Sequence, residues 1–117
     1  MSDDTEIRRG DVVVVRLDPA EGHEMRKTRP AVVVQNDVGN KNSNTTIVAP
    51  ATGTYRGYPF EVLVEASGSP FEKDFSVRLD QIRVVSVEKR IQSVAGSLAD
   101  STMGEVDDAL KLSLGLN

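Results

Sequence analysis

Short runs of β-branched and other apolar residues, separated by turn-forming residues, constrain the fold of this 117-residue chain more than any other feature. Valine fills every position from Val12 to Val15 and from Val32 to Val34. Branched side chains fit a pleated surface and favour strands, and runs this short are typical of strands rather than helices. We predict strands over residues 12–17, 31–35, 46–49, 60–65, 75–79 and 82–87.

The segment 60–65 reads FEVLVE and alternates with a period of two. Such alternation is typical of a strand with one buried and one solvated face, so we expect Glu61 and Glu65 to point into solvent. The segments between the strands are rich in Gly, Pro, Asn and Ser and are predicted to be loops. These loops cover residues 19–28, 36–44, 53–59 and 66–73.

The C-terminal region changes to helical spacing. Four apolar residues recur three or four positions apart, namely Met103, Val106, Leu110 and Leu114. This spacing predicts an amphipathic helix over residues 100–114 whose apolar side packs on the core. Thr102, in a capping box with Glu105, or alternatively Asp100, is expected to cap its start, and Gly115 to end it. Short strands and one terminal helix predict a mainly β fold, a small, bent SH3-like β-barrel.

Length and composition limit the classes of protein. The chain is expected to form one domain, 1–117, with residues 1–7 as an acidic tail. It has no cysteine and one histidine, which excludes disulfides and a multi-histidine metal site within one chain. No run approaches the roughly 20 apolar residues that span a bilayer. We expect a cytoplasmic protein without metal, cofactor or membrane association.

Charge is unevenly distributed along the chain, whose net charge is −4. Residues 8–60 carry eight basic and five acidic side chains, whereas residues 61–117 carry six basic and ten acidic ones. Nucleic-acid binding needs a local basic surface rather than a positive net charge of the whole chain. The distribution therefore leaves a nucleic-acid partner open, as it does ordinary solvated surface charge.

Four places carry side chains that are suited to catalysis or ligand binding. Pro30 restricts Arg29 to extended backbone, where its forked donors can meet a phosphate. His23 and Glu24 follow a glycine in a loop and can exchange protons near neutral pH. Thr52 ends an apolar run and offers a hydroxyl. Arg78 and Asp80 share one face of a strand, about 7 Å apart, close enough to form an ion pair. Each is also compatible with an ordinary surface position.

Five segments together resemble the MazF/Kid/PemK family of toxin endoribonucleases. They read RGDVVVVRLDP (9–19), RPAVVVQND (29–37), TTIVAPAT (45–52), SVRLDQIRVVS (76–86) and EVDDALKLSLGL (105–116). The resemblance implies a homodimer with the CcdB/Kid/MazF-like fold that cleaves single-stranded RNA without a metal. Valines stand in the first strand where many members place an aromatic residue.

The resemblance also implies roles for single residues. Arg29 and Thr52 match the most general active-site pair, and the remaining matches are His23, Glu24, Arg78, Asp80 and Gln81. We take His23, Arg29, Thr52, Arg78 and Asp80 as catalytic candidates, and Glu24 and Gln81 as RNA contacts. The general base stays open between Asp80, His23 and Glu24.

The loop over residues 53–60, GTYRGYPF, is expected to select the RNA sequence through Tyr55, Arg56 and Tyr58, because bases stack on aromatic and guanidinium groups. The tyrosines are equally compatible with packing on the rim of the barrel. The implied partners are RNA, a MazE-like antitoxin and, only through the antitoxin complex, operator DNA. Two alternatives remain: a non-catalytic CcdB-like toxin that binds a protein such as gyrase, and an inactive barrel that binds only antitoxin.

Overall fold

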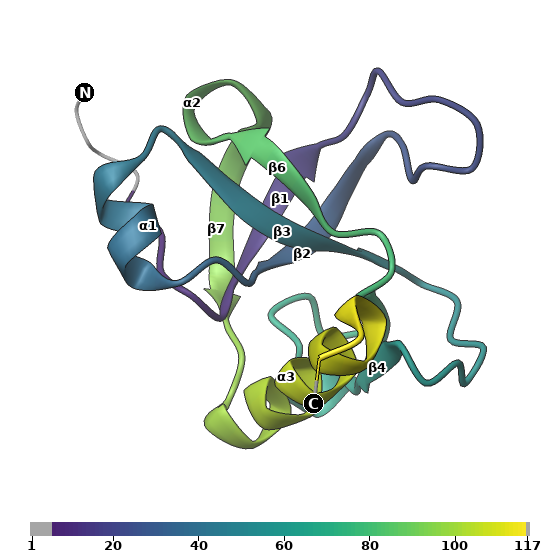
Figure 1. Cartoon of the computed structure of the whole chain (residues 1–117). Helices are drawn as coiled ribbons and strands as arrows, with labels where there is room; N and C mark the ends of the chain where they lie inside the picture. Colours follow the sequence, from purple (N-terminus) through teal and green to yellow (C-terminus); the bar gives the residue numbers. More distant parts are fainter. Residues whose placement is uncertain (1–5, 117) are drawn as a thin grey trace.

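The computed structural model describes residues 6–116 (Figure 1). Its strands are β1 (Asp11–Arg16), β2 (Thr28–Val33), β3 (Thr45–Thr52), β4 (Glu61–Val64), β5 (Phe75–Arg78), β6 (Arg83–Ser86) and β7 (Ile91–Ser97). Its helices are α1 (Asp37–Asn42), α2 (Val87–Arg90) and α3 (Asp100–Leu114), with one 3-10 turn, η1 (Ala66–Gly68). All six predicted strands occur, and the predicted class, mainly β with a C-terminal helix, is confirmed.

All strand pairs are antiparallel, in the order β4-β5-β3-β2-β1-β7, with β6 beside β3. The long strand β3 organises this sheet. Its first residues pair with β6, its middle with β2, and Ala51 and Thr52 with β5. Because one strand passes from one half of the sheet into the other, the sheet is strongly bent (Figure 1).

The unbroken valines of β1 are explained by burial on both faces. Val12 belongs to one apolar cluster, which also includes Val106 and Ala109 of α3. Val13 and Val15 point the other way into a second cluster. A strand covered on both sides needs no polar alternation.

Helix α3 covers the predicted range, but both alternatives predicted for its N-terminal cap, Asp100 and Thr102, are wrong. The residue before the helix is Ala99, which makes no side-chain cap, so Asp100 and Thr102 lie inside the first turn. Gly115 ends the helix as predicted, with a left-handed φ of 73°. Leu114 is 52% exposed, contrary to the prediction that it packs on the core.

Four elements were not predicted: α1, the 3-10 turn η1, α2 and β7. Helix α1 lies where a loop was expected, because the Asn36 side chain accepts a hydrogen bond from the Gly39 amide (2.8 Å) and caps the first turn. Strand β7 pairs with β1 through two register shifts. Its sequence, IQSVAGS, lacks regular alternation because most of its side chains are exposed.

The prediction for the acidic residues of β4 is half wrong. Glu65 is exposed as expected, whereas Glu61 is only 6% exposed. Three hydrogen-bond donors surround the Glu61 carboxylate and compensate its burial.

The predicted acidic tail lies mostly outside the described residues; within them, Ile7 is buried in the second apolar cluster. Among residues 6–116, no helix has the length and apolar character needed to cross a membrane.

Candidate functional site

A surface pocket lies where the loop after β1 meets the turn between β5 and β6. Its lining comes from the loop, from β3 and from the turn, and consists of His23, Glu24, Met25, Pro50, Asp80, Gln81, Ile82 and Arg83. Four of the residues predicted for the site are among them: His23, Glu24, Asp80 and Gln81. Topology brings them together, because the two segments are distant in sequence.

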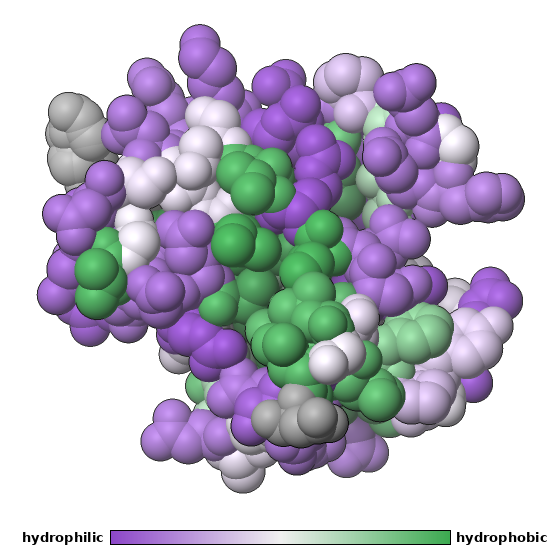
Figure 2. Space-filling model, viewed as in Figure 1, coloured by the Kyte–Doolittle hydropathy of each residue, from purple (hydrophilic) through white to green (hydrophobic). Residues whose placement is uncertain are grey.

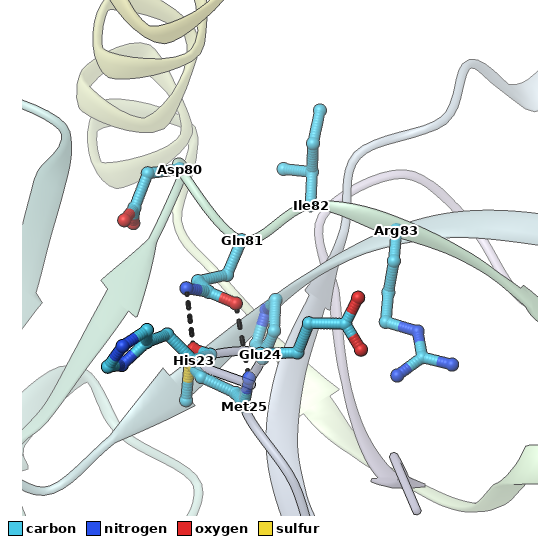
Figure 3. Close-up of a pocket in the computed structure, with 8 residues that line it drawn as sticks. His23, Glu24, Met25, Asp80, Gln81, Ile82 and Arg83 are labelled. Carbon is cyan, nitrogen blue, oxygen red and sulfur yellow. Dashed lines mark hydrogen bonds between the residues drawn. The ribbon is translucent and has the colours of Figure 1, made fainter. Parts of the chain in front are cut away.

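Gln81 attaches the two walls of this pocket to each other. Its side-chain oxygen accepts a hydrogen bond from the Met25 amide (3.1 Å), and its side-chain nitrogen donates to the His23 carbonyl (3.4 Å) (Figure 3). Gln81 thus holds the loop in place through backbone atoms. This is a structural role beside the predicted contact with RNA.

The loop itself is closed by local bonds. The Glu24 carboxylate accepts from the Glu21 amide (2.8 Å), and the Glu24 amide donates to the Glu21 carbonyl (3.0 Å). The side chain of His23 is exposed. Within the described residues, His23 is hydrogen-bonded through its backbone and not through its imidazole. In the view of Figure 3, His23 and Asp80 lie to one side of Gln81, and Glu24 and Arg83 lie to the other.

Arg78 and Asp80 form the ion pair that their spacing predicts. Arg78 Nε donates to Asp80 Oδ1 (2.8 Å) and Nη2 donates to Oδ2 (2.7 Å). The Arg78 guanidinium also lies 5.4 Å from the centre of the Phe60 ring. The hydrogen bonds that Arg78 donates to Asp80 raise the pKa of Arg78 above its ordinary value. Arg78 carries a fixed positive charge at the pocket, because a guanidinium stays protonated in proteins.

Arg29 and Thr52 lie beside the pocket without lining it. Ala31 of β2 pairs with Pro50 of β3, and Arg29 and Thr52 are each two residues beyond these partners at the same end of the strand pair. Pro50 itself lines the pocket. The Arg29 side chain turns back, and its Nε donates to the Arg26 carbonyl (2.8 Å).

The loop of residues 53–60 adjoins the end of β3 and does not line the pocket. Tyr55 and Tyr58 are 48% and 44% exposed. The Tyr58 ring stacks on Phe60 with centroids 5.0 Å apart, so it packs on one side only. Arg56 is exposed.

Arg83 lines the pocket and was not predicted as a site residue. Its Nη1 donates to the Leu17 carbonyl (3.0 Å), which fixes the guanidinium at the start of β6. The only signal in the sequence was its position two residues after Gln81. Within residues 6–116, no three side chains of His, Cys, Asp or Glu gather to hold a metal ion.

The bent sheet, the covering helix and this polar pocket define a class of protein, the MazF fold. The crystal structure of MazF from Deinococcus radiodurans superposes on this chain with a TM-score of 0.84 at 25% identity, covering 97% of this chain and 100% of that chain. MazF in a MazE-MazF complex from the same organism superposes with a TM-score of 0.77 at 27% identity, covering 97% of this chain and 100% of that chain. A mycobacterial endoribonuclease in complex with its cognate antitoxin superposes with a TM-score of 0.80 at 23% identity, covering 95% of this chain and 97% of that chain.

The family model described as PemK-like, MazF-like toxin of type II toxin-antitoxin system matches residues 8–114. The chain belongs to this family.

Proposed function

We propose that this protein is a toxin that cleaves single-stranded RNA at short sequences without a metal and thereby inhibits translation and growth. The observation that carries the proposal is one pocket that combines an exposed imidazole, His23, with the carboxylate of an Arg78–Asp80 ion pair. Arg29 and Thr52 stand at its edge as donors for a phosphate.

The proposed reaction is attack by a ribose 2′-hydroxyl on the adjacent phosphorus. A base removes the hydroxyl proton, the new O–P bond closes a 2′,3′-cyclic phosphate, and the P–O bond to the 5′-oxygen breaks. That oxygen takes up a proton from solvent water and leaves as a 5′-hydroxyl. The enzyme must supply a base for the 2′-hydroxyl proton and donors for the charge on the phosphoryl oxygens.

We assign the base to His23. Its imidazole is exposed and free to approach a substrate, and histidine exchanges protons near neutral pH. Both oxygens of Asp80 already accept from Arg78, which makes Asp80 a weaker candidate. Glu24 is engaged with the Glu21 amide.

The cations then have separate roles. Arg78 acts as a fixed positive charge rather than as the acid, because a guanidinium stays protonated in proteins. Arg29 turns from the Arg26 carbonyl to the phosphate, where its forked donors match two oxygens. Thr52 adds a neutral donor.

A homodimer is supported by an apolar band that runs from β3 and β6 to α3 (Figure 2). Val84 is 59% exposed on β6, beside its β3 partner Ile47, and Leu112, Leu114 and Leu116 are at least 52% exposed at the end of the chain. Contiguous apolar surface of this kind marks interaction sites. We propose that a second copy covers it.

The antitoxin is the second proposed protein partner. The Deinococcus MazE-MazF complex and the mycobacterial endoribonuclease bound to its cognate antitoxin have the fold of this chain. An acidic antitoxin tail suits the surface beside the pocket that carries Arg29 and Arg78. Operator DNA would be bound only through the antitoxin complex, and the protein would act in the cytoplasm.

The deciding experiment is incubation of the purified chain with mixed-sequence single-stranded RNA in EDTA. We expect cleavage at one short sequence, with 2′,3′-cyclic phosphate and 5′-hydroxyl ends identified by end-specific labelling. Intact RNA would contradict the proposal and favour a CcdB-like toxin, for which inhibition of gyrase supercoiling is the matching assay.

A further inference from the structure

Glu61 is a buried carboxylate for which the proposed reaction has no use. It is the first residue of β4 and is 6% exposed. Oε1 accepts hydrogen bonds from the backbone amides of Arg56 (3.2 Å) and Tyr58 (3.0 Å), and Oε2 accepts from the Ser76 hydroxyl (3.0 Å). A buried carboxylate is tolerated only when it is bonded in this way.

The backbone of the 53–60 loop is shaped around this carboxylate. Gly57 lies between the two donating amides and has a left-handed φ of 78°. A left-handed residue of this kind turns neighbouring amides toward one point and creates a concave site for an anion. Glu61 Oε1 fills that site, and the Glu61 amide donates back to the Tyr58 carbonyl (3.0 Å). The loop is therefore closed on its own carboxylate.

The same residue connects the loop to the ion pair at the pocket. Glu61 pairs with Arg78 across β4 and β5. The neighbouring Phe60 carries the Arg78 guanidinium on one side and stacks with Tyr58. Arg78 in turn holds Asp80, which lines the pocket. A shift of Glu61 would thus move the loop relative to the pocket.

We infer that Glu61 is a positioning residue. It fixes the 53–60 loop in the position in which Arg56 and Tyr58 contact the RNA. It does not touch the substrate, because its oxygens face the loop amides and Ser76. The effect on RNA rests on the proposed function, whereas the effect on the loop does not.

Limited trypsin digestion of the full chain tests the loop by itself. Trypsin cleaves after Arg56, and we expect Glu61→Ala to accelerate this cleavage about tenfold, because local opening no longer breaks hydrogen bonds to a carboxylate. Cleavage after Arg26 and Lys27, in the loop after β1, is the internal control and should keep its rate. Equal cleavage after Arg56 in both proteins would overturn the inference.

Glu61→Gln is the matched conservative variant. Its amide oxygen can accept from both backbone amides, and its amide nitrogen can donate to the Ser76 oxygen, so we expect near-parental digestion. If Glu61→Ala does not fold, as judged by thermal melting, Ser76→Ala replaces it. That change removes one of the three bonds and should give a smaller acceleration confined to the same site; no acceleration would overturn the inference.

Cleavage kinetics test the consequence for RNA. We expect Glu61→Ala to raise KM about tenfold while kcat falls by less than about threefold, with Glu61→Gln restoring KM. A purely structural defect would instead lower the amount of active enzyme and leave KM unchanged, which would overturn the positioning role. If the parental protein cleaves no RNA, the proposed function fails, and the trypsin result still decides whether Glu61 holds the loop.

Discussion

Arg78 and Asp80 are joined side by side, with Nε 2.8 Å from Oδ1 and Nη2 2.7 Å from Oδ2. Paired in this geometry, neither group is available in the way that a lone side chain would be. The carboxylate has given one lone pair on each oxygen to the guanidinium, and the guanidinium holds its protons more tightly. The pair is better suited to orient charge at the pocket than to exchange protons with a substrate.

The first prediction therefore concerns the base. We expect His23→Ala to abolish the rise of kcat/KM with pH, because the group whose deprotonation produces this rise is lost. Asp80→Asn should lower the rate but keep this rise. The measurement is a pH–rate profile of RNA cleavage for both variants. A flat profile in Asp80→Asn and a normal one in His23→Ala would reverse the assignment.

The second prediction concerns Arg29. Arg29→Ala should lower kcat by about 10²–10³, because a donor to the charge of the transition state is lost. Thr52→Ala should cost less, since a neutral hydroxyl stabilises charge more weakly. Among residues 6–116, the hydrogen bond of the Arg29 side chain is to one loop carbonyl, so the melting temperature should hardly change. Arg8→Ala, which removes a highly exposed arginine, is the matched control; a folded Arg29→Ala protein with the parental rate would refute the site.

The third prediction concerns salt. The whole chain has a net charge of −4, so RNA affinity has to come from a few local cations. Counterion release then requires the affinity to fall as salt rises. Fluorescence anisotropy with a non-cleavable RNA, in which the attacking 2′-hydroxyl is methylated, would measure it. A constant affinity between low and physiological salt would point to stacking alone.

The fourth prediction concerns competition. Antitoxin and RNA are proposed to share the surface beside the pocket that carries Arg29 and Arg78, so saturating antitoxin should displace labelled RNA completely. A ternary complex, seen as unchanged RNA affinity with antitoxin bound, would place the two ligands on different surfaces.

The fifth prediction concerns the apolar band. Val84→Asp places a charge in the middle of the proposed dimer surface, where its desolvation opposes association. We expect a folded monomer by light scattering coupled to size-exclusion chromatography. Val38→Asp is the control, because Val38 is 74% exposed on α1, outside the band, and its substitution should leave the dimer intact. A Val84→Asp dimer would locate the interface elsewhere.

The sequence predicted elements whose residues have strong local preferences. The valines of β1 and β2 and the helical spacing of α3 needed no knowledge of their neighbours. Strand β7 was missed because its small and polar residues form a strand only through pairing with β1. Tertiary pairing decides such segments, not local propensity.

Within the site, the same distinction applies. The Arg78–Asp80 pair was predictable from the spacing of the two residues, although the predicted shared strand face is wrong, because β5 ends at Arg78 and Asp80 lies in the turn that follows. The approach of His23 to Asp80 depends on the path of the chain, and the burial of Glu61 depends on donors from a separate loop. The spacing of residues in the sequence does not indicate that the Glu61 carboxylate will be enclosed by the 53–60 loop.

Gln81 holds the wall of the pocket by backbone atoms alone, the Met25 amide and the His23 carbonyl. These atoms are the same for every residue at position 23, and for every residue except proline at position 25. Met25 also packs against the second apolar cluster, whereas the exposed side chain of His23 does not hold the loop. Substitution at position 23 can therefore change the chemistry of the pocket while its place in the fold stays the same, which makes this position a starting point for engineering.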